Sequence, residues 1–203
     1  IRPCFIHNFS IKLYNILTKG LFAMSKKVLI ISSSLRGGSN SECLAKECER
    51  GAKDAGHDVQ FISLKGKELK FCIGCLSCQE TGKCVLKDDA ADIMSAVYNA
   101  EVIVFATPIY YYEMCGQLKT LLDRMNPLFP SDYKFRDIYM IATAEEDEPT
   151  TFDKAYNGLL GWVDCFEKAS LKGIVTGGGI GGVNAAPKHA DVMKKAYELG
   201  NTL

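Results

Sequence analysis

Four cysteines lie close together in the segment FCIGCLSCQETGKC, which spans residues 71–84. Cys72, Cys75, Cys78 and Cys84 follow the spacing C-x2-C-x2-C-x5-C. Four thiolates are the ligand set of a four-iron, four-sulfur cluster. Structural zinc sites more often use two separated C-x2-C pairs, and disulfides are a third chemistry for such a loop. A cysteine-rich loop that binds nothing is the fourth alternative, so the spacing alone leaves the question open.

The composition of the whole chain narrows these alternatives. The chain has 203 residues, nine cysteines and a formal net charge of zero. An odd number of irregularly spaced cysteines beside a large core favours reduced thiols or metal ligands in the cytoplasm over a secreted disulfide framework. The balanced charge predicts no nucleic-acid partner. No apolar run approaches the roughly 20 residues of a membrane span, so we expect no membrane contact.

The N-terminal segment differs from the rest of the chain. Residues 1–23 hold three basic and no acidic residues, and Met24-Ser25-Lys26-Lys27 after them resembles a natural start. A basic, acid-poor segment is typical of an organelle transit peptide. Because position 1 is Ile rather than Met, we prefer to interpret the segment as an upstream extension or the product of a misassigned start. We therefore expect residues 1–23 to lie outside the fold and residues 24–203 to form one domain.

A second group of chemistry-bearing residues follows the apolar run at 28–31. The segment SSSLRGGSNS, residues 32–41, leads from that run into a helix. Its glycines allow close approach of the backbone, and a helix N-terminus offers free N–H donors and a positive dipole to an anion. It matches neither a Walker loop nor a dinucleotide fingerprint. It predicts a phosphate site, with a simple helix cap as the alternative.

Three consecutive tyrosines, Tyr110–Tyr112, follow another apolar run. They cannot all point into a core. A flat site that stacks a planar ligand would explain them, and a surface turn with a dimer patch is the alternative. With the phosphate loop beside them, they favour a planar ligand with a phosphate tail.

The elements that position these loops alternate along the chain. Apolar runs predict five strands, the second near an edge because it alternates, at 28–31, 59–64, 102–105, 138–142 and 174–175. Caps and helical periodicity predict five helices, which begin near residues 39, 88, 118, 152 and 185. This alternation indicates an α/β fold with a doubly wound, five-stranded parallel sheet. Ligands bind such sheets at the carboxyl ends of the strands. A glycine-rich loop at 177–182 should border that site.

The two loops together resemble those of the flavodoxin-like NAD(P)H-dependent FMN reductase superfamily. Residues 33–41 are similar to the family pattern G-S-P-R-x-x-G-N-T. Residues 107–111 and 118–124 are similar to T/S-P-x-Y-aromatic and to a helix with L-K-x-x-x-D-R. The resemblance covers about residues 26–202 and implies a flavodoxin-like, three-layer sandwich.

The resemblance also implies FMN as the cofactor. The FMN phosphate would be held by Ser34, Arg36, Ser39, Asn40 and Ser41. The isoalloxazine ring would be lined by Pro108, Ile109, Tyr110 and Tyr111 and completed by the fourth-strand loop at Thr143. NAD(P)H would deliver a hydride to the flavin, which would pass electrons to an acceptor: FMN, a quinone or a protein. Because the flavin carries this chemistry, we expect no catalytic protein residue.

One branch of the superfamily, the iron–sulfur flavoproteins, carries C-x2-C-x2-C-x5-C in the same loop. This implies Cys72, Cys75, Cys78 and Cys84 as ligands of a 4Fe-4S cluster, while plain flavin reductases with similar loops leave the cluster-free alternative open. The family implies a homodimer or homotetramer. An electron carrier fed by a protein partner, and a regulatory or metal-binding module, are the alternative functions.

Overall fold

The computed structural model describes residues 25–203, so the predicted extension at 1–23 lies outside the described residues. The strands are β1 Lys27–Ser32, β2 Asp58–Ser63, β3 Val102–Tyr110, β4 Glu113–Met114, β5 Asp137–Thr143 and β6 Ser170–Gly177. The α-helices are α2 Asn40–Asp54, α3 Ser77–Thr81, α4 Ala90–Asn99, α5 Gly116–Arg124, α6 Asp153–Val163 and α7 Ala190–Asn201. Two 3-10 turns are η1 Asn126–Leu128 and η2 Ala186–Lys188. In this part of the chain, no helix is long and apolar enough to cross a membrane.

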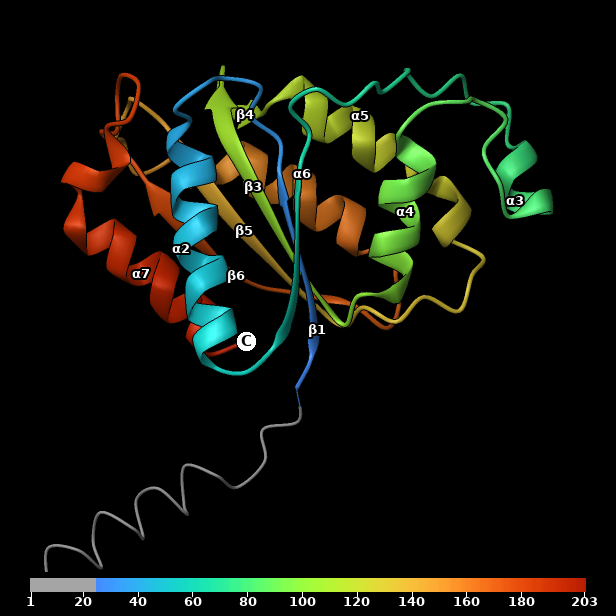
Figure 1. The fold of residues 1–203 in the computed structure, drawn as a ribbon. Helices are drawn as coiled ribbons and strands as arrows, with labels where there is room; N and C mark the ends of the chain where they lie inside the picture. The colour runs from blue at the N-terminus through green and yellow to red at the C-terminus, as the bar shows by residue number, and fades with distance from the viewer. Residues whose placement is uncertain (1–24) are drawn as a thin grey trace, which may run out of the picture.

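The sheet has the strand order β2-β1-β3-β5-β6, and these five strands are parallel (Figure 1). The prediction of a doubly wound parallel sheet is therefore confirmed, and β2 lies at an edge as expected. The short β4 pairs antiparallel with the end of β3. The chain reverses its direction of winding after β2, between β1 and β3, which creates the switch point where this fold binds ligands.

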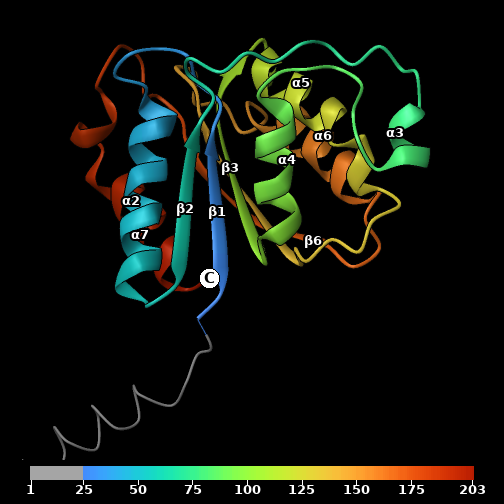
Figure 2. The ribbon, with the colours of Figure 1, turned by 45° about the vertical axis from the view of Figure 1, so that its right-hand side comes forward.

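Two helical layers cover the sheet, α2 and α7 on one face and α4, α5 and α6 on the other (Figure 2). Side chains of a strand alternate between faces. In β1, Val28 and Ile30 pack toward α2 and α7, whereas Leu29 and Ile31 pack toward the opposite layer. All four are at most 2% exposed, because a strand in the middle of a parallel sheet is buried on both faces.

The sequence did not predict two small elements, β4 and α3. β4 extends β3 into a hairpin, so β3 runs on to Tyr110 rather than ending at Phe105. α3 is a single helical turn inside the cysteine loop, between left-handed residues at Leu76 and Gly82. Both are too short to give a periodic signal in the sequence.

The helices α2 and α7 touch backbone to backbone. A Cβ atom at Gly51 would overlap the carbonyl oxygen of Tyr197, and a Cβ at Gly200 would overlap the carbonyl oxygen of Cys48. Each helix therefore uses a glycine where the other crosses it. This contact fixes the C-terminal half of α2 against α7.

Replacing Gly51 with Ala should lower the free energy of unfolding by about 1–3 kcal/mol, because the added methyl group has no room. Gly161→Ala in α6 is the matched control, since no atom lies within 4 Å of its added Cβ. That control should be neutral or stabilising by up to about 1 kcal/mol, as expected from helix propensity. Urea unfolding measures both variants, and equal stabilities would contradict the close crossing.

Candidate functional site

Four loops meet at the carboxyl edge of the sheet, after β1, β3, β5 and β6. Ser33 joins the first two, because its backbone N–H and its Oγ both donate to the carbonyl oxygen of Ala106, at 2.9 and 2.8 Å. The backbone N–H of Ala144 donates to the carbonyl oxygen of Gly177 at 2.9 Å and joins the other two. Between them lies a cleft of about 190 Å³.

Most of the predicted cofactor-binding residues line this cleft. They are Ser34, Arg36, Ser39, Asn40, Pro108, Ile109, Tyr110 and Thr143. Ala144, Glu145, Ile180, Gly181 and Gly182 complete the lining, so the glycine-rich loop does border the cleft. Ser41 and Tyr111 do not line it. Ser41 is fully buried with its Oγ 3.1 Å from that of Ser39, and Tyr111 is 98% exposed.

The first loop ends at a capped helix. The Oγ of Ser39 accepts a hydrogen bond from the backbone N–H of Glu42 at 3.3 Å, as the predicted capping box requires. The Oγ of Ser34 accepts from the backbone N–H of Arg36 at 3.3 Å. The first N–H groups of a helix have no partner within it, so those of Asn40 and Ser41 remain donors for an anion.

The side chain of Asn40 has a different role from the one the sequence suggests. Its Nδ2 donates to the carbonyl oxygens of Ile180 and Gly182, at 3.1 and 2.9 Å. Its Oδ1 accepts from the backbone N–H groups of Ala185 and Ala186, at 2.9 and 3.0 Å. An amide group can make about four hydrogen bonds, so none is left for a phosphate. Asn40 instead fixes the glycine-rich loop beside the cleft.

The tyrosine segment forms the turn between β3 and β4. Tyr111 and Tyr112 have φ values of 51° and 68°, as a tight two-residue hairpin turn requires. A left-handed backbone is unusual for bulky residues, and such residues cluster at functional sites. The ring of Tyr112 lies 5.1 Å from Nζ of Lys154. A hydrogen bond with the Glu146 carboxylate raises the pKa of the Tyr112 hydroxyl. Tyr112 is anchored by these contacts, and Tyr111 projects into solvent.

The cysteine loop follows β2 and carries α3 to the side of the domain away from α2 and α7 (Figures 1 and 2). Cys78 is buried, Cys84 is half-buried, and Cys72 and Cys75 are exposed. Hydrogen bonds from Ser77 lower the pKa of the Cys75 thiol. All four thiols are free, and among residues 25–203 no three His, Cys, Asp or Glu side chains gather closely enough to hold a metal ion.

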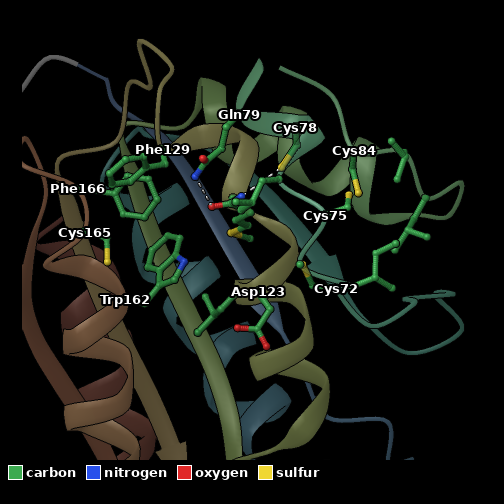
Figure 3. A pocket seen from close by; sticks show the side chains of 18 residues that line it. Cys72, Cys75, Cys78, Gln79, Cys84, Asp123, Phe129, Trp162, Cys165 and Phe166 are labelled. Carbon is green, nitrogen blue, oxygen red and sulfur yellow. Dashed lines mark hydrogen bonds between the residues drawn. The ribbon is translucent and has the colours of Figure 1, made fainter. Parts of the chain in front are cut away.

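The same four cysteines line a second, larger cavity of about 560 Å³. Figure 3 shows them across the cavity from an aromatic wall of Phe129, Trp162 and Phe166. Cys165, which is exposed, lies beside Trp162. Trp162 and Phe166 belong to the core on the helical face of α4, α5 and α6, whereas Phe129 is exposed.

A buried ion pair closes the neck of the cysteine loop. Arg124 of α5 donates to both carboxylate oxygens of Asp88, at 2.5 and 3.0 Å, and the two side chains are 1% and 0% exposed. The start of the loop joins the same pair: the backbone N–H of Lys70 donates to Asp88 at 2.7 Å, and Arg124 donates to the carbonyl oxygen of Lys70 at 2.7 Å. Both ends of the loop, Lys70 and Asp88, are therefore held by one guanidinium group.

The charge states of this pair follow from its surroundings. Burial acts to raise the pKa of Asp88, but hydrogen bonds from Arg124 and from the backbone of Lys70 and Ala90 outweigh it and lower the pKa. The same hydrogen bond raises the pKa of Arg124. In the sequence analysis, Arg124 was noted only as the last residue of the motif L-K-x-x-x-D-R. The one sign of its buried position was that this arginine lies close in sequence to the core-facing Leu118, Leu121 and Met125.

Two side chains from this region donate to cysteine sulfurs. Nη2 of Arg124 lies 3.3 Å from Sγ of Cys84, and Nδ2 of Asn126 lies 3.2 Å from Sγ of Cys78. The sequence gave no sign of Asn126, because contact between η1 and α3 is set only by the tertiary fold. The two better-buried cysteines thus each have a side-chain N–H donor from outside the loop.

The chain has clear relatives. The sequence pattern of the family described as "NADPH-dependent FMN reductase" matches residues 26–148. This chain belongs to that family. An iron–sulfur flavoprotein of Methanocaldococcus jannaschii is 40% identical over 102 residues, covering 50% of this chain and 53% of that protein. One of Methanosarcina thermophila is 32% identical over 98 residues, covering 48% and 51%. The chain spans about half the length of these curated relatives, and the resemblance to the iron–sulfur flavoprotein branch is confirmed.

Solved structures confirm the flavodoxin-like fold of this family member. The NAD(P)H:quinone oxidoreductase from Methanothermobacter marburgensis superposes with a TM-score of 0.67 at 14% identity, covering 88% of this chain and 97% of that one. An FMN-dependent NADH-azoreductase from Bacillus anthracis, in complex with FMN, superposes with a TM-score of 0.61 at 16% identity, covering 87% and 98%.

Replacing Asp88 with Asn leaves Arg124 buried without a counter-charge and should lower the free energy of unfolding by about 3–5 kcal/mol at pH 7. The pKa of Asp88 is lower in the folded state than the value of about 4 expected in the unfolded chain. Such a carboxylate stabilises the folded state at pH values above about 4, and this stabilisation is lost as the pH falls through the folded-state pKa. The variant should therefore lose less stability than the wild type between pH 5 and pH 2.

Urea unfolding across this pH range is the measurement. Asp123→Asn is the matched control. Asp123 precedes Arg124 in α5 and pairs with Lys119 in a solvent-exposed i,i+4 salt bridge. Exposed pairs contribute little, so the control should unfold near the wild-type midpoint. Equal effects of the two substitutions would show that the buried pair does not stabilise the fold.

Proposed function

We propose that this chain is an FMN-dependent oxidoreductase in which NAD(P)H reduces the flavin, and that Cys72, Cys75, Cys78 and Cys84 hold a 4Fe-4S cluster that relays electrons onward. The observation that carries the proposal is the cleft at the carboxyl edge of the sheet, which gathers eight of the residues predicted for FMN in a chain of the FMN reductase family. Family membership and cleft geometry are independent supports.

The FMN phosphate would bind at the N-terminus of α2. The open N–H groups of Asn40 and Ser41 and the hydroxyls of Ser34 and Ser39 supply the donors, and the exposed Arg36 supplies positive charge. Asn40 would contribute its backbone, since its amide is bonded to the glycine-rich loop. Ser41 would contribute only its N–H, because its hydroxyl is buried.

The flavin ring would lie along Pro108, Ile109 and Tyr110. The cleft of about 190 Å³ is smaller than the 300–1,000 Å³ usual for ligand pockets. The ring would therefore extend beyond the cleft across the half-exposed Tyr110, with Tyr111 at its outer rim and Thr143 at its inner end. This position leaves one face of the ring open to a nicotinamide or an acceptor.

When bound, the flavin would supply hydride and one-electron chemistry, and the cluster would supply one-electron transfer. The protein residues bind and orient. Four thiols within one loop fit the ligand set of a four-iron cluster in number and type, and two of their sulfurs already have N–H donors. Because the four sulfurs are not gathered, binding would require the exposed segment 72–76 to fold inward.

A second candidate function is an electron carrier that takes electrons from a protein partner. The acidic run Glu145–Glu148 favours it: Glu145 lines the cleft and Glu146 bonds to Tyr112 at the rim. Negative charge beside the flavin disfavours the approach of phosphate-bearing NAD(P)H, and it suits a basic protein surface.

The remaining parts of the proposal concern location and assembly. We expect a cytoplasmic protein, given its reduced thiols, that forms a homodimer or homotetramer. The exposed Tyr110, Tyr111 and Val183 border the cleft's mouth and would suit a contact between copies.

Anaerobic mixing of the FMN-loaded protein with NADH or NADPH separates the two functions. Bleaching of the flavin absorbance within the time of catalysis supports the reductase. A flavin that stays oxidised with both nucleotides, but is reduced by a low-potential ferredoxin-type protein, would favour the electron carrier.

Ser34→Ala and Arg36→Ala should each weaken FMN binding about tenfold or more, because a hydrogen bond to a charged group contributes about 1.5–3 kcal/mol. Fluorescence titration of the apoprotein measures the affinity. Ser63→Ala is the matched control: Ser63 ends β2 and accepts from the backbone N–H of Lys65 at 3.3 Å, as Ser34 does from Arg36, but lies outside the cleft. Unchanged affinity in the two test variants would contradict the phosphate site.

A further inference from the structure

The guanidinium of Arg124 has one donor that nothing uses. Its Nη1 bonds to Asp88 and to the carbonyl oxygen of Lys70, and its Nη2 bonds to Asp88 and to Sγ of Cys84. Nε is buried and has no hydrogen-bond partner among residues 25–203. A buried donor without a partner destabilises the fold, so such a group calls for an explanation.

The direction of this donor follows from the shape of the side chain. In a planar guanidinium, Nε–H and one Nη2–H lie along the same edge and point the same way. The Nη1–Nη2 edge of Arg124 faces Asp88, since these two nitrogens donate to its two carboxylate oxygens. The Nε–Nη2 edge is therefore the one that faces Cys84, and the unused donor lies on the side of its sulfur.

A second donor approaches the loop from the same helical end. Asn126 begins η1, directly after α5, and its Nδ2 lies 3.2 Å from Sγ of Cys78. Its Oδ1 accepts from Nε2 of Gln79 at 3.4 Å, which fixes the orientation of the amide. In Figure 3, dashed lines at Gln79 and at Cys78 mark the two hydrogen bonds that these residues make with Asn126.

We propose that Arg124 and Asn126 are positioning residues for an iron–sulfur cluster, with Nη2 and Nε of Arg124 donating to sulfur at Cys84 and Nδ2 of Asn126 donating to sulfur at Cys78. This rests on the proposed function, in which these cysteines bind the cluster. N–H donors stabilise negative charge on sulfur, and a reduced cluster carries more of it. The two residues thus favour the reduced cluster and raise its reduction potential.

Arg124 has a second effect that Asn126 does not share. Because it also holds Lys70 and Asp88 at the neck of the loop, its loss loosens the position of Cys84. Asn126 touches only the α3 side of the loop. The two residues can therefore be separated: one sets both retention and potential, and the other sets potential alone.

The test uses the full chain, purified without oxygen. Iron and sulfide are assayed relative to FMN. The reduction potential of the cluster is measured in a redox titration that is monitored by electron paramagnetic resonance. Asn126→Leu should keep the iron content and shift the potential to a more negative value. Arg124→Lys keeps a positive charge beside Asp88, but a lysine has no Nε–Nη2 edge to donate to Cys84. This variant should shift the potential in the same direction and also lower the iron content per FMN. Lys119→Ala, on the exposed face of α5, is the control and should match the wild type.

Thermal unfolding and FMN content confirm that each variant is folded. Wild-type potential and iron content in both variants would overturn the inference while leaving the cluster in place. A wild-type protein that binds FMN but holds no iron or sulfide would instead overturn the proposed cluster, and this inference with it. The two failures are distinguished by the wild-type assay alone.

Discussion

The buried ion pair between Arg124 and Asp88 is the contact on which the cysteine loop depends. A buried charge is costly unless its partner and its hydrogen bonds are complete, and here the carboxylate has four N–H donors from three parts of the chain. The pair sits where the loop leaves and rejoins the domain. Holding both ends of a long loop at fixed positions restricts the conformations open to the residues between them.

The cleft at the carboxyl edge of the sheet depends on a different constraint, the geometry of the parallel sheet. Strands that run in one direction end at one edge, so their loops meet there whatever their sequences. The chain reinforces this meeting with Ser33, which bonds to β3, and with Asn40, which holds the loop after β6. The cleft and the cysteine loop lie on separate parts of the domain, and α5 joins them by following β4 and ending at Arg124.

The fold was predictable because its signals are local and repeated. Buried strands such as 28–31 are continuous apolar runs, and the capped start of α2 marks the end of the loop for which phosphate binding is proposed. The gathering of Ser34, Pro108 and Thr143 was predictable from topology. The amide contacts of Asn40 and the sulfur contacts of Arg124 and Asn126 were not, since they join residues at least 40 positions apart through side-chain geometry. The exposure of Tyr111 was not predictable either, because the geometry of a turn decides which of its neighbouring residues faces the cleft.

A crystal structure of the anaerobically purified protein, with anomalous diffraction recorded on either side of the iron absorption edge, would decide whether the cysteine loop holds a cluster. We expect one compact iron peak bounded by the sulfurs of Cys72, Cys75, Cys78 and Cys84, with the segment 72–76 folded toward Arg124. Crystals that contain FMN in the cleft but show no iron peak, with Cys72 and Cys75 still in solvent, would contradict it.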